Sequence, residues 1–343
     1  MPSEVISDAI DRLLAGEDLG RDGAATALEA IMSGEAGDAQ TAGFLIALRA
    51  KGETAAELAG LASTIRARAE RVEPPAGPFI DTCGTGGGRS TFNSSTTASF
   101  VAAGAGVAVA KHGNRSATSR CGSADVLEAL GARIDLAPDG VARCLEETGL
   151  GFMFAPAHHP AFRHIVPVRR ALGVRTIFNL LGPLTNPAGA PRQLLGVSDA
   201  AYLERMGQAL AQLGCERAMI VRGRDGMDEV STGAVTDVVH VDGADVSVAT
   251  IDPAELGFAP PLNGQIAGSD PAGNAEVLRA VLGGAAGPAR DVVVLNAAAA
   301  LWLAGVAPDL ERAVAAAAQS IDSGAAAGRL DAFVATTRRL GGA

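Results

Sequence analysis

The feature that most constrains this chain is an alternation of short apolar runs with helical patterns, from about residue 79 to residue 321. Strands that alternate with helices are typical of an α/β domain with a largely parallel sheet. The expected strands are 79–82, 107–110, 151–155, 218–222 and 238–241. The expected helices are 94–105, 123–130, 138–148, 200–213, 275–282, 292–303 and 310–321, with a loop at 283–287.

The first 73 residues differ from the rest because they contain helical patterns only. Four helices are expected. Ser3 and Asp38 are candidate caps for the first and third, and Thr54 and Glu57 have capping-box spacing at the fourth. A Pro-Pro pair at 74–75 then interrupts the pattern. We therefore expect a small helical lobe at 1–73, followed by an α/β domain from residue 74 to residue 343.

Composition excludes several classes of protein. Of the 343 residues, 48% are hydrophobic, enough for a large core, so a disordered chain is not expected. The net charge of −10 disfavours general binding to nucleic acid or to an anionic membrane. The four cysteines form no CxxC pair, and the first residues resemble an acidic amphipathic helix rather than a signal peptide. A cytoplasmic protein is the expectation.

Three loops that follow predicted strands carry most of the polar chemistry. In the first, at 81–96, four glycines precede a helix, so backbone N–H groups and the helix N-terminus could approach an anion. These are Gly84, Gly86, Gly87 and Gly88, with side-chain donors on Asn93, Ser95 and Thr96. The loop fits neither the dinucleotide nor the P-loop pattern, and an ordinary turn with helix caps is the alternative.

The second loop, at 111–120, contains three fixed cations and no carboxylate: Lys111, Arg115 and Arg120. Such a loop in an acidic protein suits a multiply charged anion. The alternative is a solvated surface loop, although a buried strand leads directly into this one. A structural or orienting role is favoured for His112 over that of a general base.

The third loop contains Asp228 and Glu229, whose carboxylates are ligands typical of Mg²⁺ when substrate phosphates and water complete the shell. The alternative is an acidic turn. In a fourth segment, Arg169 and Arg170 have the forked geometry that binds a carboxylate, unless they only decorate a helix. Polyphosphate, Mg²⁺ and a carboxylate together indicate phosphoryl or glycosyl transfer from a phosphorylated sugar.

Five segments of the chain resemble one enzyme family. They are GTGG with TFNSST, KHGNRS with GSADVLEALG, VRRALGVRTIFNLLGPLTNP, GMDEVS, and DPAGNAEVLRAVL with VVLNAAAALWLAG. In this order they resemble anthranilate phosphoribosyltransferase, which joins anthranilate to 5-phosphoribosyl 1-diphosphate (PRPP) in tryptophan biosynthesis. The resemblance extends from the N-terminal helices to about residue 322. It implies the fold of pyrimidine nucleoside phosphorylases, with helices near 161–185 added to the helical lobe and a homodimer formed through that lobe.

The resemblance also implies roles for individual residues. PRPP would contact Gly84, Gly87, Thr91, Asn93, Ser94, Ser95, Thr96, Lys111, His112, Gly113, Asn114, Arg115, Ser119 and Ser123. Anthranilate would contact Gly84, Asn114, Arg169, His112 and Pro183, and Ser95, Asp228 and Glu229 would ligate Mg²⁺, two ions per monomer. No essential general base is expected, because an aryl amine is already uncharged at neutral pH.

This sequence departs from the family pattern at two places. The glycine loop is one residue shorter than usual and lacks the acidic residue that normally follows GTGG. Ser94 occupies a position that is usually apolar. Three alternatives stay open: a nucleoside phosphorylase, a nucleic-acid-binding paralogue without activity, and a transferase for another aromatic acceptor. The acidic pair and the KHGN segment disfavour the first, and the net charge disfavours the second.

Overall fold

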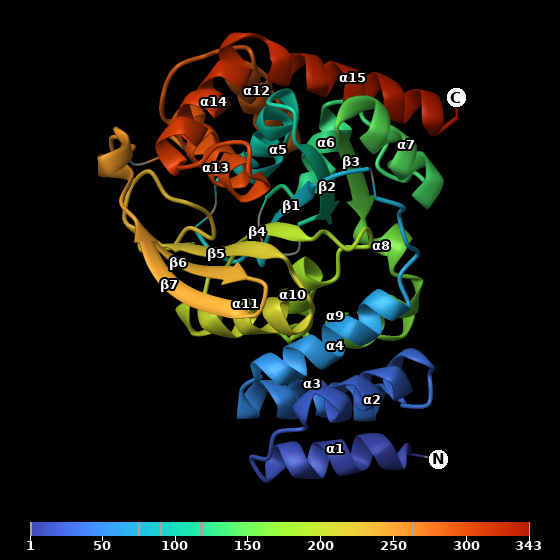
Figure 1. The fold of residues 1–343 in the computed structure, drawn as a ribbon. Coiled ribbons are helices and arrows are strands. Elements are labelled where there is room, and N and C mark those ends of the chain that lie inside the picture. Colours follow the sequence, from blue (N-terminus) through green and yellow to red (C-terminus); the bar gives the residue numbers. More distant parts are fainter. Residues whose placement is uncertain (1, 75, 90, 117–119, 263, 343) are drawn as a thin grey trace.

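The N-terminal part of the computed structural model is helical, as expected. The model describes residues 2–74, 76–89, 91–116, 120–262 and 264–342. The first helices are α1 (Glu4–Leu14), α2 (Gly20–Met32), α3 (Asp38–Lys51) and α4 (Ala55–Ala67), at the bottom of Figure 1. The capping box at α4 is confirmed by reciprocal hydrogen bonds between Thr54 and Glu57. Ser3 is the N-cap residue of α1 as expected, although its side chain makes no capping hydrogen bond, and the prediction for Asp38 is wrong, because α3 begins at Asp38 itself, after Gly37.

A seven-stranded sheet forms the centre of the described chain. Its strands are β1 (Phe79–Gly84), β2 (Ala108–Gly113), β3 (Leu150–Phe154), β4 (Arg192–Gly196), β5 (Arg217–Gly223), β6 (Thr236–Asp242) and β7 (Asp245–Ile251). Their spatial order is β3-β2-β1-β4-β5-β6-β7. The first five are parallel, and β6 and β7 extend the sheet in antiparallel fashion. The expected largely parallel sheet is confirmed, while β4 and β7 were not predicted.

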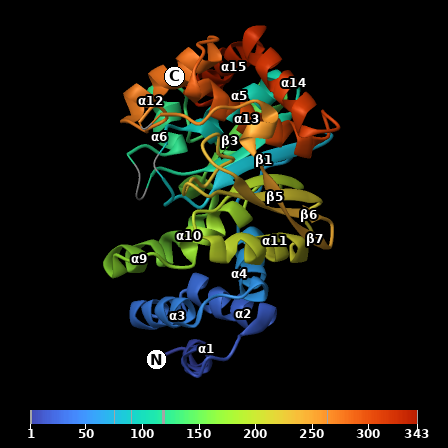
Figure 2. The ribbon, with the colours of Figure 1, turned by 90° about the vertical axis from the view of Figure 1, so that its left-hand side faces the viewer.

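Helices cover both faces of this sheet (Figures 1 and 2). The larger group consists of α5 (Ser94–Gly104), α6 (Ser123–Ala129), α7 (Pro138–Thr148), α12 (Pro271–Leu282), α13 (Pro288–Ala304), α14 (Leu310–Asp322) and α15 (Ala325–Leu340). On the opposite face, α11 (Leu203–Gln212) packs between β5, β6 and the N-terminal helix α4. Helix α15 was not predicted, whereas the loop at 283–287 separates α12 from α13 as expected.

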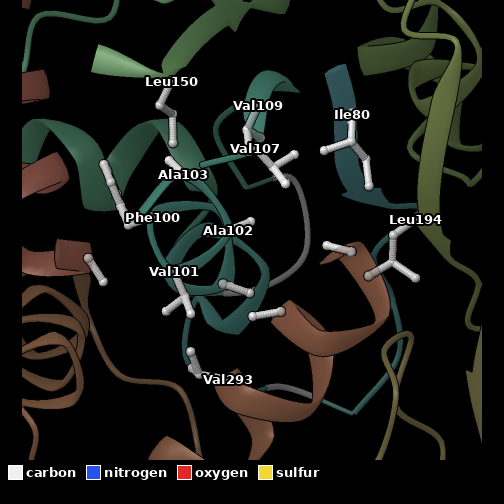
Figure 3. Packing of buried hydrophobic residues seen from close by; sticks show 14 of the residues in the cluster. Ile80, Phe100, Val101, Ala102, Ala103, Val107, Val109, Leu150, Leu194 and Val293 are labelled. Carbon is white, nitrogen blue, oxygen red and sulfur yellow. The ribbon is translucent and has the colours of Figure 1, made fainter. Parts of the chain in front are cut away.

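The core of the α/β part is built around α5. Figure 3 shows Phe100 and Val101 of this helix among side chains of the sheet and of α13, including Ile80, Val109 and Val293. All five of these side chains are fully buried. Helix α5 is buried on nearly every side: nine of its eleven residues are buried, and its C-terminal half is apolar. Its N-terminus is thereby fixed beside the carboxyl ends of the strands.

The segment between β3 and β4 lies against the N-terminal helices. It contains α8 (Ala155–His158), α9 (Val166–Leu172) and α10 (Phe178–Leu181), with 3₁₀ turns at Pro160–His164 and Gly182–Leu184. Ile165, Ile177 and Leu181 belong to the same apolar cluster as Leu45 and Leu48 of α3. This segment therefore connects the helical part of the molecule with the edge of the sheet. Among the described helices, none is both long and apolar enough to cross a membrane.

Candidate functional site

A cavity of about 680 Å³ lies at the carboxyl ends of the parallel strands, where open α/β sheets bind ligands. The three predicted loops and the segment from α8 to Pro183 all contribute to its wall. Every residue to which the family resemblance assigns a role lines it except Ser94, whose side chain is fully buried, and Ser119, which is outside the described residues. The structure therefore brings together residues that are up to 145 positions apart, Gly84 and Glu229 being the extremes.

The glycine loop is tied to the acidic turn. The Gly86 N–H donates to a carboxylate oxygen of Asp228 at 2.9 Å, and the Arg89 N–H donates to the Gly226 carbonyl at 2.7 Å. A β-carbon on Gly88 would lie 2.9 Å from the other Asp228 carboxylate oxygen, which is too close for any side chain. The loop thus packs directly on Asp228 and leaves no room for a side chain at Gly88, where the family normally has an acidic residue after GTGG.

Asp228 and Glu229 are partly buried in the wall of the cavity. Burial raises the pKa of Asp228, and burial together with the neighbouring Asp228 raises the pKa of Glu229 to about 8. The Ser94 hydroxyl donates to the Glu229 carboxylate and favours its ionised form. Two carboxylates in this setting would gain from a nearby cation.

The donor set fits a hard divalent cation. Within the described ranges no three His, Cys, Asp or Glu side chains converge on one point, so the protein alone does not enclose an ion. Two carboxylates and the Ser95 hydroxyl on an open wall match the way proteins hold Mg²⁺, which keeps several ligands from water and substrate phosphate.

Lys111 provides a cation at the end of β2. Its side chain is 2% exposed, and its ammonium group donates to the Thr82 carbonyl. Burial lowers the pKa of Lys111, while the charge of the fully buried Asp81 opposes that shift. The Asp81 carboxylate also accepts the His112 backbone N–H at 3.2 Å. Asp81 thus fixes the strand end that carries Lys111.

The remainder of the second loop is less cationic than its own sequence indicates. Arg115 forms ion pairs with Asp125 and Glu128 of α6. The Asn114 carbonyl accepts hydrogen bonds from the Ser123 hydroxyl at 3.3 Å and from the Ala124 N–H at 3.2 Å. Carboxylates ten and thirteen residues further along the chain therefore neutralise one of the three predicted cations.

The site contains a pair of histidines, of which only His112 was predicted. His112 and His159 are buried, and their Nε2 atoms are 3.2 Å apart. The Nδ1 of His112 lies 3.1 Å from the Gly182 carbonyl, so Nδ1–H donates there and Nε2 accepts from His159. Burial and the partner ring lower the pKa of His112 to about 3, and burial lowers that of His159 to about 4. Both rings are neutral, which suits an orienting role.

Arg169 forms the opposite wall of the cavity. Its guanidinium lies over the Phe178 ring, 5.5 Å from the centroid, and burial lowers its pKa. Arg170 is exposed and does not line the cavity. Of the two candidate arginines, only Arg169 is therefore in a position to bind a carboxylate in the cavity. Arg175, which was not predicted, donates to the Gly86 carbonyl at 3.1 Å and joins this wall to the glycine loop.

Two family models match the chain. The model for a glycosyl transferase family α/β domain matches residues 76–327, and the model for a glycosyl transferase family helical bundle domain matches residues 7–69.

Relatives match it over nearly its whole length. Anthranilate phosphoribosyltransferase from Rubrobacter xylanophilus is 52% identical, over 98% of this chain and 99% of that protein, and the one from Moorella thermoacetica is 53% identical over 95% and 96%. The solved anthranilate phosphoribosyltransferase from Thermus thermophilus is 43% identical with a TM-score of 0.91, covering 96% and 99%. The Saccharomyces cerevisiae enzyme in complex with PRPP and Mg is 28% identical with a TM-score of 0.90, covering 98% of each chain. The chain belongs to the anthranilate phosphoribosyltransferase family.

Proposed function

We propose that this protein transfers the phosphoribosyl group of PRPP to the amine of anthranilate, giving N-(5-phosphoribosyl)anthranilate and diphosphate in tryptophan biosynthesis. One observation carries the proposal: a single cavity has phosphate-binding and acidic groups on one wall and Arg169 on the other. Solved relatives named for this activity contain PRPP and Mg, or 4-fluoroanthranilate.

PRPP would bind on the wall made by the strand ends. The residues proposed for it are Gly84, Gly87, Thr91, Asn93, Ser94, Ser95, Thr96, Lys111, His112, Gly113, Asn114, Arg115, Ser119 and Ser123. The N-terminus of α5 and the glycine-loop amides other than those of Gly86 and Arg89 offer N–H groups to the diphosphate, and the Lys111 ammonium offers positive charge. For Ser94 the backbone is the available partner, because its hydroxyl is bonded to Glu229.

Mg²⁺, with two ions per monomer, would be held by Ser95, Asp228 and Glu229. When bound, it would neutralise charge on the diphosphate as that group leaves. The packing of the glycine loop on Asp228 supports this assignment, because it holds the carboxylate beside the amides that face the diphosphate.

Anthranilate would bind between the two walls, with Arg169 and Pro183 on one side and Gly84, His112 and Asn114 on the other. Arg169 would bind its carboxylate, Asn114 would orient it, and Gly84, His112 and Pro183 would line its path. The amine attacks the anomeric carbon of PRPP, the bond to diphosphate breaks, and the amine proton leaves after the C–N bond begins to form. The neutral amine needs no prior deprotonation, so the protein's task is alignment and stabilisation of the leaving group.

The wider organisation is proposed on the same basis. Residues 1–73 with 161–185 would form the helical lobe that bears the acceptor side and the homodimer contact, and the rest of 74–343 would bind PRPP and Mg²⁺. The shared apolar cluster of α3 with the segment 165–181 supports this division. We place the enzyme in the cytoplasm, because its cysteine spacing is that of a chain from a reducing compartment.

A direct assay tests the proposal. Purified protein, PRPP, Mg²⁺ and anthranilate are mixed, and the loss of anthranilate fluorescence is followed, with omission of each component as a control. We expect loss only in the complete mixture. No loss, in the presence of an active reference enzyme that passes the same assay, would refute the assigned activity.

A further inference from the structure

Asn296 is a polar side chain within the apolar helix α13. From Val292 to Leu303 its neighbours in the helix are apolar, and Asn296 itself is 3% exposed. A buried amide is costly unless its hydrogen bonds are made. The Asn296 side-chain oxygen accepts the Val230 N–H at 3.0 Å, and its NH₂ group donates to the carbonyls of Val230 at 2.9 Å and Val292 at 2.8 Å. Most of its bonding capacity is therefore directed at one residue, Val230.

Val230 directly follows Glu229 in the loop between β5 and β6, where the backbone belongs to no helix or strand. Such a loop depends on side chains to fix its shape. The N–H of Val230 belongs to the peptide group that follows Glu229, and its carbonyl belongs to the next one, so a side chain that bonds to both fixes the planes of these two peptide groups. It thereby fixes the direction in which the Glu229 side chain leaves the backbone.

The other end of Glu229 is also fixed. Its carboxylate accepts the Ser94 hydroxyl at the start of α5, and Ser94 is fully buried. Asn296 and Glu229 both line the cavity. Glu229 is thus held at its backbone by α13 and at its carboxylate by α5.

We propose that Asn296 is a positioning residue that aims the Glu229 carboxylate at the Mg²⁺ bound with PRPP. The inference rests on the proposed function of Glu229 and assigns a task to Asn296 within the VVLNAAAALWLAG segment. The competing explanation is that the amide bonds only stabilise the fold.

Thr148 provides a matched control for that explanation. Its buried hydroxyl accepts the Leu150 N–H at 3.2 Å, and its single proton is shared between the carbonyls of Cys144 at 2.7 Å and Leu150 at 3.0 Å, so it too contacts both backbone groups of one residue. It is the last residue of α7, two positions before β3, and does not line the cavity. Thr148→Val therefore removes comparable bonds without touching the acidic turn.

The experiment measures Mn²⁺ affinity at saturating PRPP from the electron paramagnetic resonance signal of the free ion. It compares the wild type with Asn296→Ala, Asn296→Ser and Thr148→Val, and thermal unfolding is recorded for each. We expect both Asn296 variants to bind Mn²⁺ at least about tenfold more weakly, as happens when a group that orients a metal ligand is removed. Thr148→Val should retain wild-type affinity at a similar loss of stability. If Asn296→Ala does not fold, the Mn²⁺ affinity of Asn296→Ser tests the proposal. Serine disturbs the fold less than alanine, because it keeps a polar hydroxyl group at this buried position and leaves a smaller cavity.

The outcomes separate the two levels of inference. Wild-type Mn²⁺ affinity in folded Asn296 variants would overturn the positioning role while leaving the proposed function intact. A wild-type protein that binds no Mn²⁺ with PRPP would instead refute the metal assignment for Glu229.

Discussion

Gly196 at the end of β4 lies against the backbone of Asp228 so closely that a β-carbon on Gly196 would overlap the Asp228 carbonyl oxygen. Gly196→Ala should therefore displace the acidic turn. We expect a loss of stability of about 1–3 kcal/mol, as overpacked cores show. We also expect a fall in kcat of about 100-fold, because misplacement of a catalytic group by about 1 Å has that effect. Steady-state kinetics and denaturant unfolding measure the two effects.

Gly328→Ala is the matched control for Gly196→Ala. Gly328 lies inside α15, and a β-carbon there would meet nothing within 4 Å. Alanine should be neutral or stabilising by up to about 1 kcal/mol, because it favours a helix more than glycine does. Full activity in Gly196→Ala would show that the contact with Asp228 does not position the turn.

The double substitution Asp228→Ala with Glu229→Ala should remove the response to metal. In the wild type, Mg²⁺ with PRPP should raise the melting temperature, because ligands that bind only the folded state stabilise it. The double variant should lose this shift and most of its turnover. Asp242→Ala with Asp245→Ala, two exposed carboxylates at the β6–β7 turn, should keep both. Chelation of Mg²⁺ with EDTA should reproduce the effect in the wild type.

Arg169→Ala should mainly raise the KM for anthranilate, by about tenfold or more, because it removes a charge-assisted bond to the carboxylate. Arg170→Ala should leave this KM unchanged, since Arg170 is exposed and outside the cavity. The measurement is a full kinetic series in both substrates. If Arg169→Ala raised the KM for PRPP and not that for anthranilate, the assignment of Arg169 to the anthranilate carboxylate would be wrong.

His112→Asn should retain kcat within about tenfold, less than the 10²–10⁴-fold that a general base contributes. The ring is neutral, its pKa is lowered to about 3, and its Nδ1–H already donates to Gly182. The pH profiles of kcat for the wild type and for His112→Asn should therefore have the same shape near pH 6.5. Loss of kcat at saturating substrates would contradict a mechanism without a base.

The same histidine predicts acid sensitivity of the fold. An unfolded histidine binds a proton below about pH 6.5, whereas folded His112 does not until about pH 3. The unfolded state therefore binds more protons in this window, and stability falls as the pH decreases through it. For this one group, the free energy of unfolding should drop by about 1.4 kcal/mol between pH 7.5 and 5.5. His112→Asn should reduce the drop, as urea titrations at the two pH values would show.

The parts of the fold that sequence predicted are those with a strong local pattern. Strands such as β1 and β5 are apolar runs that end in polar loops, and both were found. β4 was missed because it is short and carries Arg192 and Gln193, whose polar groups bond to distant backbone. β7 was missed because it is an exposed edge strand, although the Asp242-Gly243 turn before it is a hairpin signal.

In the site, too, the features with a local sequence pattern were predicted and those that depend on distant contacts were not. Loops that follow strands were predicted to converge, because parallel strands end at one edge of the sheet, and they line one cavity. The pairing of His112 with His159 depends on where the segment after β3 folds back, which no spacing in the sequence encodes. The available signal for a second histidine in the site was the adjacent pair His158 and His159, which follows β3 shortly before Pro160. The ion pairs of Arg115 with α6 likewise depend on a turn that brings the helix back.

The two walls of the cavity come from different parts of the chain: strand ends and α5 form one, and the segment from α8 to Pro183 forms the other. Part of the acceptor site can therefore change on its own. A mutational library confined to residues 155–185, but sparing His159, Gly182 and Arg175, which bond to the strand-end wall, would vary one side of the acceptor site while the residues that hold the donor stay in place.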